Sequence, residues 1–152
     1  MKEFFDERRL LSRLNAFPFL KRMGMRVLSC REGKSEILCK ARPALMNSTG
    51  VLQGGVIGVW ADLSAATAVR SVLHPLLRMT TIEYKVNLFK PVAEGVALTA
   101  HGSVLRLGKT IVVGVSELRD AEGKPAAFAT VTFYISEIAA KKSRKKSKAK
   151  GA

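Results

Sequence analysis

Cysteine and histidine are scarce in this sequence. Its 152 residues include two cysteines, Cys30 and Cys39, and two histidines, His74 and His101, and none of them has the spacing of a metal site. We therefore expect no bound metal. The cysteines are expected to serve as small apolar strand residues in a reducing compartment, with a disulfide across a hairpin as the less favoured alternative.

The sequence also lacks a long uninterrupted apolar run. Residues 1–17 mix acidic and basic side chains every few positions, which argues against a secretory signal. The longest apolar stretch, residues 56–72, is interrupted by Asp62 and Arg70, so a buried helix explains it better than a membrane span. Together these absences predict a cytoplasmic protein.

Several common catalytic signatures are missing as well. The sequence contains no G-x-S-x-G elbow, no Walker A lysine loop, no H-E-x-x-H motif and no G-x-G-x-x-G after a predicted strand. These absences argue against a serine triad, a phosphate-binding loop and a dinucleotide site. Any catalysis is therefore expected from carboxylates, amides and backbone N–H groups.

Acidic residues are few, and the basic excess is unevenly distributed. Residues 141–152 hold seven of the 26 basic residues and no acidic one, which leaves 19 basic and 12 acidic residues elsewhere. The segment 139–152 is expected to form a disordered tail, because it has no apolar face to bury. It is either a solubilising tail or a weak contact for nucleic acid or an anionic membrane. The positive charge of the remainder favours an anionic ligand.

The length and the apolar fraction of 47% predict one domain with a proper core. Periodicity predicts an N-terminal amphipathic helix within residues 1–16 and a folded domain over residues 17–138. The expected elements of that domain are strands over 25–31 and 35–42, a long buried helix from 54 to about 73, and strands over 79–90, 96–107, 110–119 and 125–135. This order predicts an α+β fold in which a curved antiparallel sheet encloses one long central helix.

The predicted strand over 79–90 alternates without interruption. One face would carry Thr80, Ile82, Tyr84, Val86 and Leu88, and the other Thr81, Glu83, Lys85 and Asn87. A period of two is typical of a half-buried strand.

The segment 47–62 carries the strongest candidate chemistry. Gln53, Gly54 and Gly55 stand at the start of the predicted helix, where free N–H groups and the helix dipole can hold a developing oxyanion. Asp62 lies two to three turns further on, and an acid inside an apolar helix is costly unless it is paired or serves a cleft. The alternatives are that Gln53 only caps the helix, that the glycines only allow close packing, and that the acid is bonded for structural reasons.

Further candidates lie outside the helix. Asn47 can orient the loop or a carbonyl, although asparagine in a turn usually serves the turn. Thr81 can position a water molecule, although threonine is also a common strand residue. Some of the basic residues at predicted strand ends and turns are expected to contact phosphates: Lys90, Arg106, Lys109 and Lys124.

The ordered succession of motifs resembles a known family. The motifs are N-x-x-G-x-x-Q-G-G from Asn47, Asp62 nine residues after Gln53, T-I-E-Y-K-V-N-L-F-K-P from Thr81, R-L-G-K from Arg106 and D-A-E-G-K from Asp120. They resemble the hotdog-fold acyl-CoA thioesterases, and within them the PaaI-like, 4-hydroxybenzoyl-CoA thioesterase type. The resemblance covers about residues 17–135.

The resemblance implies a hotdog domain assembled as homodimers or homotetramers, with each active site across a dimer interface. It implies Asp62 as nucleophile or general base, the Gly55 N–H as donor to the thioester carbonyl, Thr81 as a water-orienting hydroxyl and Asn47 as a loop residue near the thioester. Many relatives have histidine in place of Gln53, and glutamine can donate to the carbonyl but cannot transfer a proton near neutral pH. Coenzyme A would be part of the substrate, so no cofactor is expected.

Two rival functions remain open on the sequence. A non-catalytic hotdog module would bind acyl-CoA as a sensor and contact nucleic acid through its basic tail. A hotdog hydratase or dehydratase commonly uses a histidine with an acid, but neither His74 nor His101 lies in the predicted helix beside Asp62. We therefore expect hydrolysis of an acyl-CoA to a carboxylic acid and CoA. The acyl pocket is expected to be shaped by Trp60, Leu63, Phe89 and residues of a second subunit.

Overall fold

One antiparallel sheet and a central helix make up most of the protein. The computed structural model describes residues 6–138. In chain order the elements are α1 (Glu7–Ala16), α2 (Pro18–Arg22), β1 (Met25–Arg31), β2 (Lys34–Lys40), the 3-10 helix η1 (Pro43–Leu45), α3 (Gly54–Arg70), β3 (Leu77–Leu88), β4 (Ala97–Leu107), β5 (Ile111–Arg119) and β6 (Pro125–Glu137). The expected order of helices and strands is confirmed.

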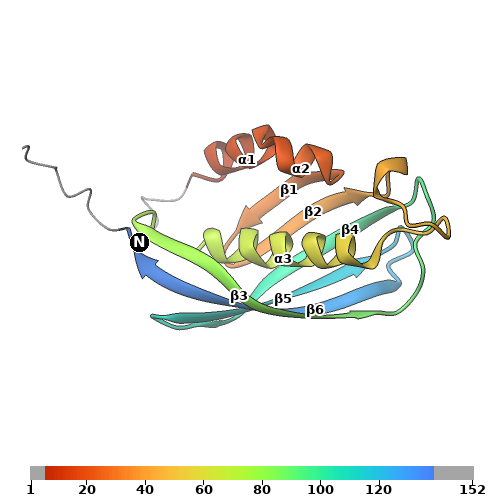
Figure 1. Ribbon diagram of the computed structural model, residues 1–152. Helices are drawn as coiled ribbons and strands as arrows, with labels where there is room; N and C mark the ends of the chain where they lie inside the picture. The colour runs from red at the N-terminus through yellow and green to blue at the C-terminus, as the bar shows by residue number, and fades with distance from the viewer. Residues whose placement is uncertain (1–5, 139–152) are drawn as a thin grey trace, which may run out of the picture.

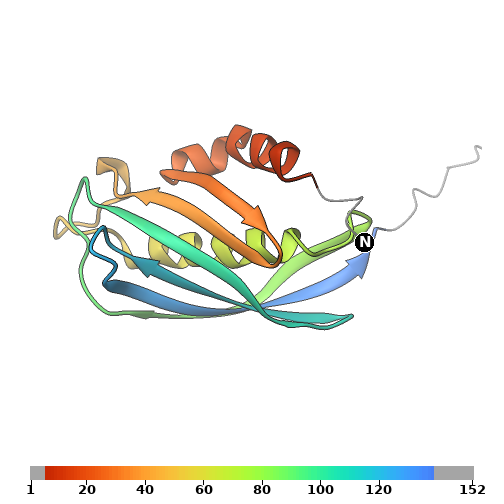
Figure 2. The ribbon, with the colours of Figure 1, turned by 180° about the vertical axis from the view of Figure 1, so that it is seen from behind.

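The sheet curves around α3, as Figure 1 shows. Its strand order is β1-β2-β4-β5-β6-β3, and every pair of neighbours is antiparallel. The view from behind shows the strands passing across the length of the same helix (Figure 2). Because α3 contacts all six strands, most of its circumference is buried, which explains why its sequence is apolar on nearly every side. The predicted fold class is confirmed.

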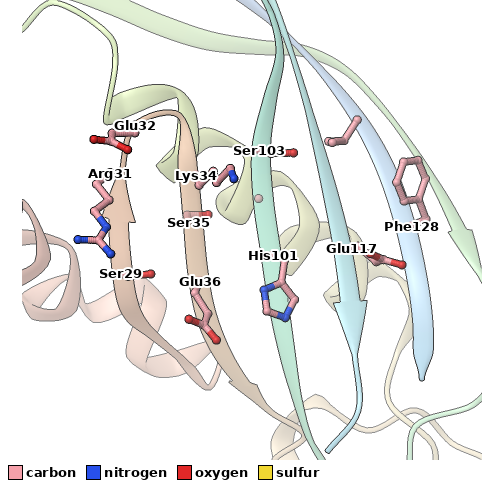
Figure 3. Close-up of a pocket in the computed structure, with 12 residues that line it drawn as sticks. Ser29, Arg31, Glu32, Lys34, Ser35, Glu36, His101, Ser103, Glu117 and Phe128 are labelled. Atoms are coloured by element: carbon pink, nitrogen blue, oxygen red, sulfur yellow. The ribbon is translucent and has the colours of Figure 1, made fainter. Parts of the chain in front are cut away.

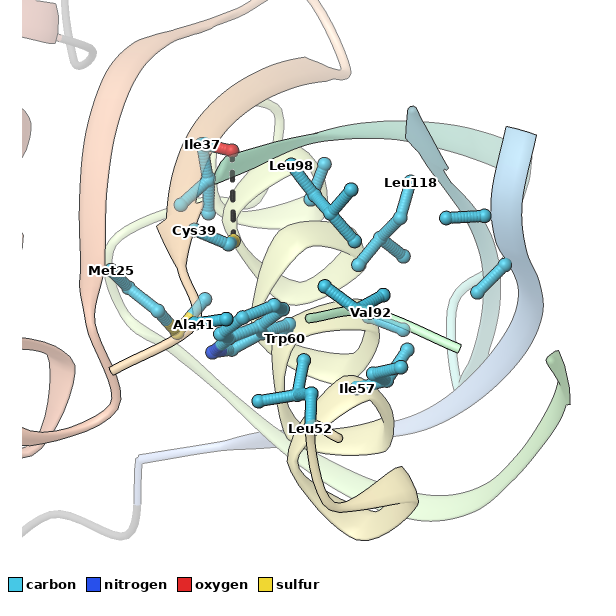
Figure 4. Packing of buried hydrophobic residues seen from close by; sticks show 14 of the residues in the cluster. Met25, Ile37, Cys39, Ala41, Leu52, Ile57, Trp60, Val92, Leu98 and Leu118 are labelled. Atoms are coloured by element: carbon cyan, nitrogen blue, oxygen red, sulfur yellow. Dashed lines mark hydrogen bonds between the residues drawn. The ribbon is translucent and has the colours of Figure 1, made fainter. Parts of the chain in front are cut away.

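The core lies between α3 and the concave face of the sheet. Trp60 is fully buried there, and its indole N–H donates to the Met23 carbonyl oxygen at 2.7 Å. Ile37, Leu98 and Leu118 belong to the same cluster and come from three different strands (Figure 4). The expectation that Trp60 shapes an acyl pocket is therefore wrong, because its ring fills the core.

The two cysteines are buried and free. Burial raises the pKa of the Cys30 thiol to about 12 and also raises that of Cys39. Both thiols therefore stay protonated and unreactive near neutral pH. Their expected role as apolar strand residues is confirmed.

Some expectations are not tested by the structure. None of the helices within residues 6–138 combines the length and the apolar character that a membrane span needs, and the cytoplasmic location stays a prediction. The division of the chain at residues 16 and 17 also stays a prediction. The expected tail, with its nucleic-acid or membrane contact, lies outside the described residues.

β1 is one edge of the sheet, and α1 covers it (Figures 1 and 2). The Asn15 side chain donates to the Val27 carbonyl oxygen at 2.9 Å and accepts from the Val27 N–H at 2.8 Å. Glu7 accepts from the Cys30 N–H at 3.0 Å. The helix therefore satisfies backbone groups that a neighbouring strand would otherwise take.

β3 is the other edge, and it contains a β-bulge. Thr81 pairs with Phe133 and Glu83 with Thr132, so Ile82 is an extra residue on β3. The prediction of one unbroken alternation is wrong, because an extra residue exchanges the faces of the strand from that point on. Thr81 faces α3 together with Tyr84, whereas Ile82 is 58% exposed.

Candidate active site

Asp62 and Thr81 meet between α3 and β3. The Thr81 hydroxyl donates to Asp62 Oδ1 at 2.8 Å, and both side chains are partly buried. Partial burial among apolar side chains raises the pKa of the Asp62 carboxyl, and the hydrogen bond from Thr81 lowers it by a smaller amount. The carboxylate is therefore more basic than a solvated one, which suits a general base or a nucleophile.

The N-terminus of α3 supplies the predicted hydrogen-bond donors. Gln53 is the N-cap residue, it is exposed, and its side chain makes no capping hydrogen bond. Gly54 and Gly55 are the first two helical residues, so their N–H groups have no partner within the helix. Gly55 is exposed, and a Cβ added there would meet no atom within 4 Å, so the space beside this residue is open.

Asp62 and Gly55 lie on the same side of α3 but not close together. Seven residues correspond to about two turns, which places both on one stripe, and to a rise of about 10 Å along the axis. A donor and a nucleophile that act on the same carbonyl each have to lie within about 3.5 Å of it. One subunit therefore brings Asp62 together with Thr81, but not with its own Gly55.

Asn47 serves the loop before α3. Its side-chain oxygen accepts from the Thr49 N–H at 2.9 Å, from the Thr49 hydroxyl at 2.8 Å and from the Val51 N–H at 3.2 Å. These bonds fix a turn, so the Asn47 side chain serves the turn, as asparagine usually does there. A catalytic contact of the side-chain amide stays a prediction.

A groove of about 370 Å³ lies beside the start of α3. Asn47 lies at one of its sides, Gly54 and Ile57 form the helix side, and Phe89 and Lys90 belong to the segment after β3. Most of the lining is apolar, with one cation. The groove therefore offers an apolar surface next to the free N–H groups of the helix, and it includes the expected pocket residue Phe89.

The four predicted phosphate contacts do not gather at one place in the subunit. Lys90 forms an ion pair with Asp120, and the hydrogen bond from Lys90 holds the pKa of the Asp120 carboxyl below its usual range. Lys124 belongs to the same turn as Asp120 and donates its N–H to that carboxylate. Arg106 and Lys109 lie at the β4–β5 turn, the opposite end of the sheet. Their contacts to phosphates stay a prediction.

A hollow of about 560 Å³ lies on the outer face of the sheet and contains none of the predicted site residues (Figure 3). His101 pairs with Glu36 on β2 and with Glu117 on β5, so one histidine stands between two carboxylates. Within residues 6–138 no group of histidine, cysteine and acidic residues has the geometry of a metal site. This hollow is therefore separate from the chemistry at Asp62.

Residues 49–127 match the model of the 4HBT family, the thioesterase superfamily. The match covers about half of the chain and includes Gln53, Asp62 and Thr81. The chain belongs to the thioesterase superfamily. The family resemblance of the sequence motifs and the class of enzyme that it implies, an acyl-CoA thioesterase, are thereby confirmed.

Other members and structures are similar over most of the chain. A protein of Saccharolobus solfataricus described as an esterase is 30% identical over 115 residues, which cover 76% of this chain and 81% of that protein. A thioesterase from Haemophilus influenzae has a TM-score of 0.81 at 22% identity, covering 93% of this chain and 97% of its own. A thioesterase-type protein from Streptococcus pneumoniae, solved with coenzyme A, has a TM-score of 0.69 at 22% identity, covering 74% and 86%. These structures establish the hotdog fold.

Tyr84 is a residue of the site region that the motifs did not single out. Its ring lies against Gly58, at 3.2 Å from the position that a Cβ would occupy there. The available signal was a tyrosine on the strand that also carries Thr81, but the bulge hides which face it takes. The structure shows both side chains facing α3.

Proposed function

We propose that this thioesterase hydrolyses an acyl-CoA thioester to a carboxylic acid and CoA, at sites that two subunits form together. The observation that carries the proposal is the pair of Asp62 and Thr81 on the same stripe of α3 as the open N–H groups at its start. A carboxylate of raised pKa and an oxyanion-binding helix end are the two parts that acyl transfer needs.

The distance along α3 supports a site shared by two subunits. About 10 Å separates Asp62 from Gly55 in one subunit, so neither residue reaches the reacting carbonyl of the other. Two antiparallel copies of α3 would bring Asp62 of one subunit opposite Gly55 of the partner subunit. The uncovered edge of β3 lies beside this stripe and offers backbone groups for pairing with a second copy. The homodimer is therefore the proposed unit, and a homotetramer stays a prediction from the resemblance.

The reaction follows from the chemistry of these groups. The Gly55 N–H and the Gln53 amide donate to the thioester carbonyl oxygen, and each donor is worth about 10²–10³ in rate in comparable sites. Asp62 either attacks the carbonyl carbon itself or takes a proton from an attacking water. In both routes the tetrahedral intermediate expels the CoA thiolate. The first route leaves a mixed anhydride that water then cleaves, and the second gives the carboxylic acid directly. Because a thiol has a pKa of about 8.5, the thiolate leaves without a strong acid, so Gln53 need not transfer a proton.

The first test is Asp62→Asn. Asparagine keeps the shape and can still accept the hydrogen bond from Thr81, but it is neither a base nor a nucleophile. We expect the fold to persist and the turnover of a panel of acyl-CoA substrates to fall by at least about a hundredfold, measured by release of free thiol. Unchanged turnover in the purified variant would remove Asp62 from the mechanism.

The second test addresses the shared site. Asp62→Asn and Gln53→Ala subunits, each of low activity alone, are co-expressed with different tags and purified as the mixed dimer. One site of that dimer would then contain an intact Asp62 and an intact Gln53, so about half of the wild-type activity per dimer is expected. If each site lies within one subunit, mixing restores nothing.

The same panel separates the non-catalytic alternative. A sensor of acyl-CoA would bind the substrates, which is measurable by calorimetry, without release of CoA. Binding without release by the wild-type protein would replace hydrolysis with that function.

A further inference from the structure

The packing of the subunit does not account for the position of the Tyr84 side chain. Its ring rests on Gly58 of α3 and stays 50% exposed, and its hydroxyl has no hydrogen-bond partner among residues 6–138. A side chain whose only role is core packing would be covered. Packing within one subunit therefore leaves part of the ring available for a contact with a ligand or with a second subunit.

The ring belongs to a row of contacts between α3 and β3. A Cβ at Gly54 would lie 3.0 Å from Leu88, a Cβ at Gly58 would lie 3.2 Å from Tyr84, and Asp62 accepts from Thr81 at 2.8 Å. The three helix positions are four residues apart, so each contact is about one turn from the next. Tyr84 thus lies one turn from Asp62, on the side toward the helix N-terminus.

The proposed dimer places Tyr84 close to both active sites. If Gly55 of each subunit faces Asp62 of the other, the two-fold axis passes near the midpoint of that segment, at residues 58 and 59. Tyr84, on Gly58, then lies between the two reacting carbonyls. The CoA part of the substrate carries phosphates and has to stay toward solvent, so the acyl part is the end that points inward.

We propose that the ring of Tyr84 is the inner wall of the acyl pocket and sets the largest acyl group that the enzyme accepts. This inference rests on the proposed function. The absence of a side chain at Gly58 is what allows the ring to lie this close to the helix, because a Cβ there would displace it. Shortening the residue at 84 would lengthen the pocket, and filling position 58 would shorten it.

The test compares acetyl-, hexanoyl-, decanoyl- and phenylacetyl-CoA in the full-length wild-type protein and its variants. Tyr84→Ala is expected to raise kcat/KM for the larger acyl groups relative to acetyl-CoA by about tenfold or more, the range that pocket size controls. Gly58→Ala is expected to shift the ratio the other way. Tyr84→Phe, which keeps the ring, is expected to keep the wild-type ratio.

A matched control distinguishes size selection from loss of structure. Ile82→Ala removes an apolar side chain of the same strand that points away from α3, and it should leave the ratio unchanged. A structural role of Tyr84 would lower kcat/KM for all four substrates by one factor, and that result would overturn the inference. So would a Tyr84→Phe variant that behaves like Tyr84→Ala. If the wild type hydrolyses none of the substrates, the proposed function fails as well, whereas an active wild type with an unchanged ratio overturns this inference alone.

Discussion

The two edge strands of the sheet, β1 and β3, differ in whether another element covers them. At the β1 edge, Asn15 and Glu7 of α1 occupy the backbone groups of Val27 and the N–H of Cys30, which blocks pairing with a further strand at these positions. At the β3 edge, no element within residues 6–138 covers the strand. In the proposed dimer, sealing one edge and leaving the other open would direct association to β3, because two open edges would allow chains of indefinite length.

The edges also differ in what their residues do. The polar side chains of α1 that face β1 form hydrogen bonds with its backbone and so contribute to stability. At β3, the bulge turns Thr81 toward Asp62, and the carboxylate there is only partly buried. Changes at β1 should therefore alter the folding of the protein, and changes at β3 should alter its reaction.

The largest effect is expected from opening the sealed edge. Asn15→Leu leaves the N–H and the C=O of Val27, a buried residue, without their partners. We expect the free energy of unfolding to fall by about 1–3 kcal/mol, and larger assemblies to appear because β1 can now pair with another chain. Urea denaturation at fixed protein concentration and light scattering after size exclusion measure the two effects.

The control for this variant is Ser12→Leu. Ser12 is on the exposed side of α1, so this change adds the same side chain without touching β1. If the two variants have equal stability and equal size in solution, the hydrogen bonds of Asn15 do not protect the edge.

A smaller effect is expected at the open edge from Thr81→Val. The substitution removes the hydrogen bond that favours the charged form of Asp62, so the pKa of that carboxyl rises further above its usual range. The acid limb of the profile of kcat/KM against pH should move to higher pH, and kcat should fall by about tenfold, the worth of one hydrogen bond to a charged group.

Thr80→Val is the matched control, because Thr80 is the neighbouring residue and is exposed. It should leave both the pH profile and kcat as in the wild type. An acid limb that moves equally in the two variants, or in neither, would show that Thr81 does not act through Asp62.

The sequence predicts the elements of this fold well because the signals are local. Glycine and proline mark most turns. The apolar helical segment is clear from Gly54 onward, and the alternation with a period of two is clear from Met79 onward. The helix with its single acid is recognisable for the same reason. Asp62 and Gln53 are therefore recognisable as candidate site residues from the sequence.

The rest depends on pairing between distant segments. A bulge at Ile82 follows from the register of β3 against β6, which no local pattern in the strand reveals, so the alternation places Thr81 and Tyr84 on opposite faces although both face α3. The role of Asn15 was missed, although an asparagine four residues after Leu11 on the apolar side of a helix is a usable signal. The sequence also does not show that the basic residues at strand ends lie far apart, because the β4–β5 and β5–β6 turns are at opposite ends of the sheet.

The smallest effect is expected on the stability of the Asp62→Asn variant, which loses activity. Since burial raises the pKa of Asp62 in the folded protein, the folded state binds the proton more tightly than the unfolded state does. The cost of the charged form is absent below the unfolded-state pKa and fully present above the folded-state pKa, so it grows as pH rises between them. Asp62→Asn removes this cost.

The inactive variant should therefore be more stable than the wild type near neutral pH. The expected gain is a few tenths to about 1 kcal/mol, because a partly exposed carboxylate is screened by solvent. Urea denaturation between about pH 4 and pH 8 should show the difference narrowing toward the acid end. If the difference in the free energy of unfolding between the variant and the wild type is constant across this range, the charged form of Asp62 does not destabilise the fold. The contrast between a β1 edge that stabilises the protein and a β3 edge that serves the reaction would then lose its energetic basis.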